Sequence, residues 1–159
     1  MNERVHIRPV EPRHAPQLEP LFQRIESFTP DEVACAVEVL TRAAESGNRE
    51  YVGLVAEEGS RVVGVIAYGE TPMTDGTYDL YWIASDPEWR RRGIGAALLG
   101  RMEEDLRGRG ARLVRVETSG LPVYQPTRAF YERFRYGETA RLRDFYRPGD
   151  DLVIFTKRM

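Results

Sequence analysis

The sequence predicts a mixed α/β domain in which helices flank a central sheet. Runs of alternating apolar and polar residues, rich in β-branched and aromatic side chains, are typical of strands. Between them lie runs with apolar residues three and four positions apart, which are typical of amphipathic helices. The order is β-α-α-β-β-β-α-β-α-β-β, which favours a mixed sheet covered by helices. The 159 residues suit one domain, 1–159, built around a single core.

Seven strands are expected, separated by turn residues. They cover residues 5–10, 51–57, 61–70, 77–85, 113–118, 138–146 and 152–157. The Glu-Gly-Ser run at 58–60 predicts a hairpin between the second and third strands. The Arg-Pro-Gly-Asp run at 147–150 predicts another between the last two strands.

Four helices are expected, and each has an apolar face to pack on the sheet. The first covers residues 12–25. The second begins at Pro30, where Thr29 is the N-cap and Glu32 completes a capping box, and it ends at Gly47. The third runs from about residue 93 to the glycines at 108 and 110, and the fourth covers residues 126–134.

The junction between the fourth strand and the third helix is rich in cations and glycines. The first peptide units of a helix leave N–H groups without acceptors, and the helix dipole adds positive potential there. Gly93 and Gly95 leave these groups open to a ligand, and the arginines at 90–92 can pair with phosphate oxygens. The junction therefore predicts a phosphate-binding loop, although a turn with a solvated basic edge is the neutral interpretation.

Two common phosphate-binding motifs do not match this junction. A P-loop requires Lys and then Ser or Thr after its last glycine, but alanines follow Gly95. A dinucleotide fingerprint requires Gly or Ala at position 98 and a place early in the chain, but residue 98 is Leu and the segment lies past mid-chain. A nucleoside triphosphatase and an NAD or FAD enzyme are therefore not expected.

Composition points to a small-molecule partner rather than nucleic acid. The net charge is -2, so the three consecutive arginines are a local feature of the chain. No apolar run approaches a membrane span, and the cytoplasm is the expected location. Cys35 is the only cysteine and is expected to be a buried helical thiol. His6 and His14 lack ligand-spaced neighbours, so no metal site is expected.

The loop resembles a known family motif. Its sequence Arg90-Arg91-Arg92-Gly93-Ile94-Gly95 fits Arg/Gln-x-x-Gly-x-Gly/Ala, which is similar to the pyrophosphate loop of the GNAT acyltransferases. The element order also matches the GNAT fold, so the resemblance covers nearly the whole chain. It implies a mostly antiparallel sheet whose middle strands splay apart and hold the pantetheine arm of acetyl-coenzyme A. It also implies an N-acetyltransferase in which an amine attacks directly in a ternary complex.

The resemblance further implies partners and cofactor-binding residues. The expected partners are an amine acceptor and, in a homodimer, a second copy of the chain. The strand before the loop lends main-chain groups to pantetheine and an oxyanion donor to the thioester. The cofactor-binding residues so implied are Ile83, Ala84, Ser85, Arg90, Arg91, Arg92, Gly93, Ile94, Gly95 and Ala96.

Two carboxylates are candidates for the catalytic base. Asp79 lies eleven residues before Arg90, the offset at which protein-modifying family members carry a catalytic glutamate. Period-two alternation places Asp79, Tyr81 and Ile83 on one face of the strand. The alternative role for Asp79 is a carboxylate that only pairs with an arginine. Glu117 is the second candidate, although the same count points its side chain away from the gap between the splayed strands.

Tyr131 is the candidate acid. The run from Phe130 to Tyr136 resembles the Phe/Leu-Tyr-x-x-x-Gly-Phe/Tyr signature of the last family helix, whose tyrosine often protonates the leaving thiolate. Tyr131 could instead be an aromatic core residue. The sequence departs from the family at Arg135, where glycine is usual, and at Tyr124, where asparagine often contacts pantetheine.

The acceptor and two rival functions stay open at this stage. Glu57, Asp79, Glu117 and Asp144 would suit a cationic amine, whereas the neighbouring arginines would suit one that carries a carboxylate. A non-catalytic acyl-coenzyme A binding module would keep the loop without turnover. A protein-interaction domain would use the arginines as a surface patch, and coenzyme A would then not raise its melting temperature.

Overall fold

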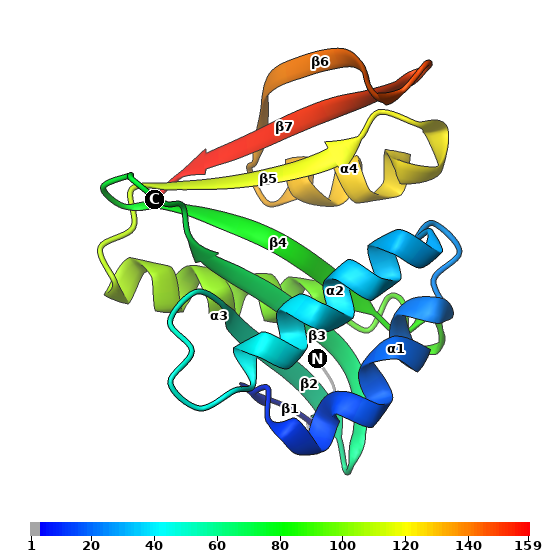
Figure 1. Ribbon diagram of the computed structural model, residues 1–159, viewed down its shortest axis with the longest axis vertical. Helices are drawn as coiled ribbons and strands as arrows, with labels where there is room; N and C mark the ends of the chain where they lie inside the picture. The colour runs from blue at the N-terminus through cyan, green and yellow to red at the C-terminus, as the bar shows by residue number, and fades with distance from the viewer. Residues whose placement is uncertain (1–3) are drawn as a thin grey trace.

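The computed structural model describes residues 4–159, so the first three residues of the expected domain lie outside it (Figure 1). A seven-stranded sheet runs through these residues. Its strands are β1 (Val5–Pro9), β2 (Val52–Glu58), β3 (Arg61–Glu70), β4 (Thr77–Ser85), β5 (Leu113–Ser119), β6 (Gly137–Arg147) and β7 (Asp150–Arg158). The strands are ordered β1-β2-β3-β4-β5-β7-β6, and only β4 and β5 are parallel neighbours. The expected mixed, mostly antiparallel sheet is confirmed.

Four α-helices and three short 3-10 turns complete the described part. The helices are α1 (Ala15–Gln23), α2 (Pro30–Ala43), α3 (Ile94–Gly108) and α4 (Gln125–Arg133), and the turns are η1 (Pro12–His14), η2 (Pro87–Trp89) and η3 (Pro122–Tyr124). The predicted capping box is present, because Thr29 Oγ1 accepts from Glu32 N and the Thr29 amide donates to Glu32 Oε2. The element order is the one that the sequence predicts.

The helices cover the sheet from both faces. Helices α1 and α2 lie over one face and α3 and α4 over the other (Figure 1). The core under α3 contains Ile94, Leu98, Met102 and Leu106, the four residues spaced for one helix face. The core under α1 and α2 contains Leu18, Leu21, Phe22 and Leu40. The sheet is therefore buried on both faces beneath these helices.

Strands β4 and β5 separate after a short pairing. Their register runs only from Thr77↔Leu113 to Leu80↔Val116. Beyond that point β4 stays paired to β3 and β5 stays paired to β7, and the two strands diverge (Figure 1). The splayed middle strands that the resemblance implies are present.

The prediction that Cys35 is buried is wrong. Cys35 is exposed on α2. The buried positions of this helix include Val33, Ala36 and Leu40, which recur every three or four residues. Because successive residues are about 100° apart around a helix, Cys35 lies beside this stripe rather than in it.

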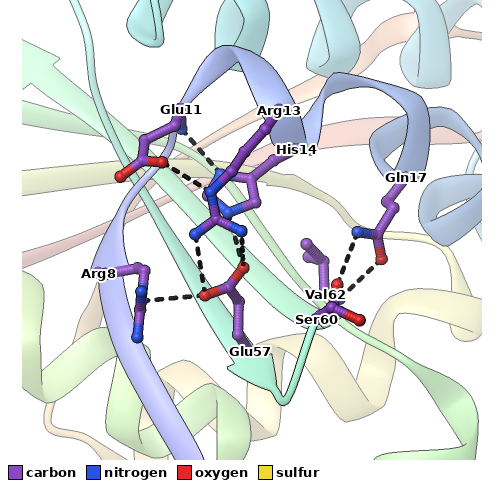
Figure 2. Close-up of polar contacts among 8 residues, drawn as sticks. All are labelled: Arg8, Glu11, Arg13, His14, Gln17, Glu57, Ser60 and Val62. Carbon is purple, nitrogen blue, oxygen red and sulfur yellow. Dashed lines mark hydrogen bonds and ion pairs between the residues drawn. The ribbon is translucent and has the colours of Figure 1, made fainter.

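A buried carboxylate fixes the first strand and turn to the sheet. The Glu57 side chain is 2% exposed on β2 and accepts hydrogen bonds from Arg13 and His14 at 2.9 and 2.8 Å (Figure 2). It also forms an ion pair with Arg8 Nε at 2.9 Å. His14 Nδ1 accepts from the Glu11 amide at 2.8 Å, so the proton on Nε2 is the one donated to Glu57. Glu57 therefore lies two strands away from the β4–β5 gap with its oxygens occupied, and it is not available to an acceptor amine.

The pKa of Glu57 has a consequence for acid stability. Burial opposes the charged carboxylate, but the hydrogen bonds from Arg13 and His14 outweigh burial and hold the pKa below its ordinary value of 4.5. A depressed folded-state pKa stabilises the fold above the unfolded pKa, and this contribution is lost as the pH falls through the folded value.

We expect Glu57→Gln to lower the free energy of unfolding by about 2 to 3 kcal/mol at pH 7, because two arginines lose a buried charged partner. The deficit should shrink below about pH 4, where the wild-type carboxylate also becomes protonated. Urea unfolding at pH 7 and pH 3.5 measures both values. Glu58→Gln, at the next position on β2, is the matched control because Glu58 forms no ion pair among residues 4–159. An equal deficit at both pH values would contradict the assignment.

Candidate active site

The predicted loop leads directly from β4 into the first turn of α3. After Ser85 the chain forms the turn η2 and then the three arginines, and Gly93 is the N-cap of α3. Gly93 has φ +76° and Arg91 has φ +63°, so the backbone twice enters the left-handed region within three residues. Glycine adopts this conformation at little cost, and Gly93 allows the chain to turn sharply into the helix.

Six consecutive amides of this loop have no acceptor within residues 4–159. The last hydrogen bond before them is from Arg90 N to Pro87 O, and the first after them is from Ala97 N to Gly93 O. The six are the N–H groups of Arg91, Arg92, Gly93, Ile94, Gly95 and Ala96. Such a run of unpaired donors at a helix N-terminus fits an anion.

The arginines of the loop carry free charge beside these donors. Arg90, Arg91 and Arg92 are exposed, and none forms an ion pair with a described carboxylate. The Arg92 guanidinium lies 4.6 Å from the ring centroid of Trp89, which is itself buried. This cation–π contact gives one of the three cations a fixed position.

The first turn of α3 sits directly on β3, a contact that the sequence does not reveal. A Cβ built on Gly64 would lie 2.5 Å from Ile94 Cγ2. No side chain larger than hydrogen therefore fits at Gly64 unless Ile94, and the free amides beside it, are displaced. A Cβ built on the next residue, Gly95, would lie 3.4 Å from the Phe130 ring of α4, which is an ordinary contact distance.

The edge of β4 that faces the gap has no strand partner beyond Leu80. Ile83, Ala84 and Ser85 are paired on the β3 side only, at Ile66, Val65 and Gly64. Their main-chain groups on the β5 side are therefore open to an extended ligand.

The expectation that Asp79, Tyr81 and Ile83 share one face is wrong for Ile83. Trp82 pairs with Ala67 and Leu80 pairs with Tyr68, so Tyr81 is an extra residue in a β-bulge. A bulge shifts the alternation by one residue. Ile83 packs in the core beneath α3, whereas Asp79 and Tyr81 line a hollow with Arg115 and Glu117.

The two candidate bases meet in this hollow of about 110 Å³. The Asp79 side chain is 10% exposed and accepts from Arg115 Nε at 2.7 Å and from Thr71 Oγ1 at 2.8 Å. Glu117 does not point away from Asp79, and its side chain is 45% exposed with Arg115 Nη1 at 3.8 Å. Asp79 is thus held by an arginine, and Glu117 is the accessible carboxylate.

Tyr131 lies on the opposite side of the sheet, in the core beneath α3 and α4. It is 3% exposed, and its ring contacts Phe130, Tyr136 and Phe155 at centroid distances of 5.6, 5.9 and 5.9 Å. Its hydroxyl has no hydrogen-bond partner among residues 4–159. The hydroxyl oxygen keeps slight exposure, because every fully buried polar side-chain atom in that range has a partner. Burial raises the pKa of Tyr131, which keeps the phenol protonated.

The two departures from the family signature have distinct structural outcomes. Arg135 takes the glycine conformation with φ +70°, and Tyr136 N donates to Tyr131 O at 3.0 Å, so α4 still ends in a tight turn. The Tyr124 hydroxyl donates to Ser27 O at 2.7 Å and lies 3.2 Å from Glu32 Oε2. Burial and the Glu32 carboxylate raise the pKa of Tyr124. Tyr124 thus bridges the segment after β5 to the α1–α2 connection.

Three further observations concern the remaining described residues. A larger hollow of about 630 Å³ lies between the second half of α3 and strands β1 to β3, and none of the predicted site residues lines it. Across residues 4–159 no three His, Cys, Asp or Glu side chains are grouped to hold a metal ion. In the same range no helix combines the length and hydropathy that a membrane span requires.

A mixed sheet whose middle strands splay apart, followed by a loop of unpaired amides at the start of α3, is the arrangement of the acyltransferases that the sequence resembles. The model of the acetyltransferase (GNAT) family matches residues 17–136. The chain belongs to this family, and it is an acetyltransferase that transfers an acetyl group to an amine. No curated protein matches the chain.

Solved structures agree with this assignment. A GNAT-family protein from Desulfovibrio desulfuricans is 40% identical, covers 97% of this chain and 98% of its own, and superposes with a TM-score of 0.92. The ribosomal-protein-S18-alanine N-acetyltransferase from Escherichia coli is 22% identical over 97% and 93% of the two chains, with a TM-score of 0.77. The PaiA N-acetyltransferase from Thermoplasma acidophilum, solved with coenzyme A, is 16% identical over 98% and 99%, with a TM-score of 0.77. The last two show the shared fold.

Proposed function

We propose that acetyl-coenzyme A is the acetyl donor and that the loop from Arg90 to Ala96 binds its pyrophosphate. The run of six free amides carries this proposal, because no group in the described chain satisfies them. Three unpaired guanidinium groups beside the amides add the charge that two phosphates require. The complex of PaiA with coenzyme A supports the same cofactor for this fold.

The open edge of β4 would hold the pantetheine arm. Ile83, Ala84 and Ser85 supply main-chain groups that face the gap, and one of their amides can stabilise negative charge on the thioester oxygen. The carboxylate hollow and Tyr131 lie on opposite faces of the sheet. An amine that enters from the α1 and α2 side could therefore attack directly in a ternary complex.

The two proton transfers of the reaction are assigned to two side chains, and a third positions its neighbour. Glu117, the accessible carboxylate, would take the amine proton directly or through water. Asp79 would hold Arg115 in place, and it remains the alternative base. The Tyr131 hydroxyl would protonate the leaving thiolate.

The acceptor is proposed to be an amine of a small molecule or of a protein. The S18-alanine enzyme and an aminoglycoside 6'-N-acetyltransferase share the fold, so both kinds of acceptor fit it. A cytoplasmic location and a homodimer also remain proposals, and the fully exposed edge strand β6 supports the second.

We expect coenzyme A to bind the wild-type protein and to lose nearly all affinity for Gly95→Asp, as measured by calorimetry. The new carboxylate would repel the pyrophosphate at the helix N-terminus. The variant should fold, since a Cβ at Gly95 meets Phe130 at an ordinary distance and an acidic residue suits a first turn. Gly100→Asp is the control, because nothing lies within 4 Å of a Cβ at Gly100 on the same helix. Equal affinity in both variants would exclude the loop.

We expect Tyr131→Phe to reduce kcat about 10²- to 10⁴-fold and to leave coenzyme A affinity unchanged, because only the hydroxyl is removed. Tyr136→Phe is the matched control. The Tyr136 hydroxyl donates to Glu103 at 3.0 Å, so its loss should lower the melting temperature but not kcat. Steady-state kinetics and thermal unfolding separate the two roles. A Tyr131→Phe enzyme with undiminished kcat would make Tyr131 a core residue only.

We expect Glu117→Gln to lower kcat about 10²-fold or more and to remove the acidic limb of the pH–rate profile. Asp79→Asn should have a smaller effect on kcat and should keep that limb. The pH dependence of kcat/KM for both variants measures this difference. The reverse result, with the limb lost only in Asp79→Asn, would make Asp79 the base.

A further inference from the structure

The buried carboxylate of Asp86 stands where the cofactor loop begins. Asp86 follows β4 and is 0% exposed. Its N–H donates to Val63 O at 2.9 Å, and its carbonyl accepts from Trp89 N at 2.8 Å. Its Oδ1 accepts from Glu88 N at 3.0 Å, which caps η2. Every polar main-chain group of this residue is therefore in use, and one carboxylate oxygen holds the turn.

The other carboxylate oxygen is held by two guanidinium groups from distant segments. Arg24, just after α1, reaches Asp86 Oδ2 at 2.7 Å, and Arg61, at the start of β3, reaches it at 2.9 Å. Arg61 also contacts Glu88 Oε2 at 2.7 Å. Burial opposes the charged form, but the Glu88 amide and the two arginines outweigh burial and hold the pKa of Asp86 below its ordinary value.

The free amides begin directly after the turn that Asp86 holds. The last bonded amide is that of Arg90, and the unpaired run starts at Arg91. Within the run, Ile94 is 2% exposed and packed on Gly64, which fixes the backbone there. Two contacts therefore fix the loop, the polar contacts of Asp86 before it and the packing of Ile94 on Gly64 within it. Donors that are held in place before a ligand arrives bind it more tightly, because little ordering remains to be done.

We infer that Asp86 is a positioning residue for the cofactor loop, and that it acts through η2, Arg24 and Arg61 to hold the amides of residues 91–96 in the arrangement that binds pyrophosphate. This inference rests on the proposed binding of acetyl-coenzyme A. Asp86 itself carries negative charge close to a site for an anion, where it would repel phosphate if the two arginines did not neutralise it.

Positioning and simple electrostatics predict opposite effects for Asp86→Asn. Removal of the carboxylate charge leaves Arg24 without a described acidic partner and Arg61 with Glu88 alone, so charge alone would strengthen anion binding. Loss of the Asp86 contacts that hold the loop would instead weaken anion binding. Asparagine keeps a side-chain acceptor for Glu88 N and therefore retains the cap of η2. Asp86→Ala removes both the cap and the charge.

We expect the dissociation constant of coenzyme A to rise roughly tenfold in Asp86→Asn and further in Asp86→Ala, because a buried charged hydrogen-bond partner is lost. Calorimetry with coenzyme A measures this change. Steady-state kinetics should show the loss in the KM for acetyl-coenzyme A, with kcat nearly kept. With S-acetylpantetheine, which has the same thioester but no pyrophosphate, the Asp86 variants should match the wild type.

The matched control is Glu57→Gln, which removes a second buried carboxylate held by two arginines, Arg8 and Arg13, neither of which contacts Asp86 or the loop (Figure 2). It should cost comparable stability without changing coenzyme A affinity. Arg24→Gln, which changes a half-exposed side chain, gives a variant that folds if the Asp86 variants do not, and it should weaken coenzyme A binding to a smaller degree.

The outcomes distinguish this inference from the proposed function. Unchanged or tighter coenzyme A binding in Asp86→Asn, or an equal loss with S-acetylpantetheine, would overturn the positioning role alone. Wild-type protein that fails to bind coenzyme A would overturn the proposed function and the inference with it.

Discussion

The active-site architecture depends on the short length of the β4–β5 pairing. Four paired positions, Thr77 to Leu80 with Leu113 to Val116, join the two halves of the sheet, and the strands then separate. A longer pairing would satisfy the main chain of Ile83 to Ser85 from both sides and leave nothing for an extended ligand. The separation also opens the sheet between its two faces. The candidate acid beneath α3 and α4 and the candidate bases on the α1 and α2 face can therefore serve one reaction centre.

The buried charges of this structure are paired, whereas the charges of the loop arginines are not. Two buried carboxylates, Glu57 and Asp86, are each surrounded by basic side chains, and these partners hold the pKa of each carboxylate below its ordinary value although burial opposes this. By contrast, the three arginines of the loop have no described carboxylate partner. An unpaired cation costs little at an exposed position, so stability does not select for pairing there. The free charge and the free amides coincide at one place, which favours a ligand with more than one negative charge.

Much of this fold could be predicted from local sequence, and the exceptions share a physical reason. The element order, the capping box at Thr29, the apolar face of α3 and the glycine at the loop N-cap depend on periodicity or on neighbouring residues. The face of Ile83 was mispredicted because the bulge at Tyr81 arises from the register with β3. Asp86 could not be identified as an anchor, since its partners lie 25 and 62 residues away. The need for glycine at position 64 could not be predicted either, because it arises from the packing of Ile94 of α3 on β3.

Side-chain contacts join the two halves of the sheet at both ends of the gap between β4 and β5. At the paired end Glu103 of α3 accepts from Lys157 on β7 at 2.8 Å and from Tyr136 at 3.0 Å, which ties the loop helix to the other half of the sheet. At the splayed end the Tyr124 hydroxyl reaches Ser27 O across the two halves. Because the two halves are joined at both ends of the gap, the separation of β4 and β5 is fixed before a ligand binds between them. Tyr124 therefore has a physical role at the position where the family often has asparagine, since its longer side chain spans a distance that the amide cannot.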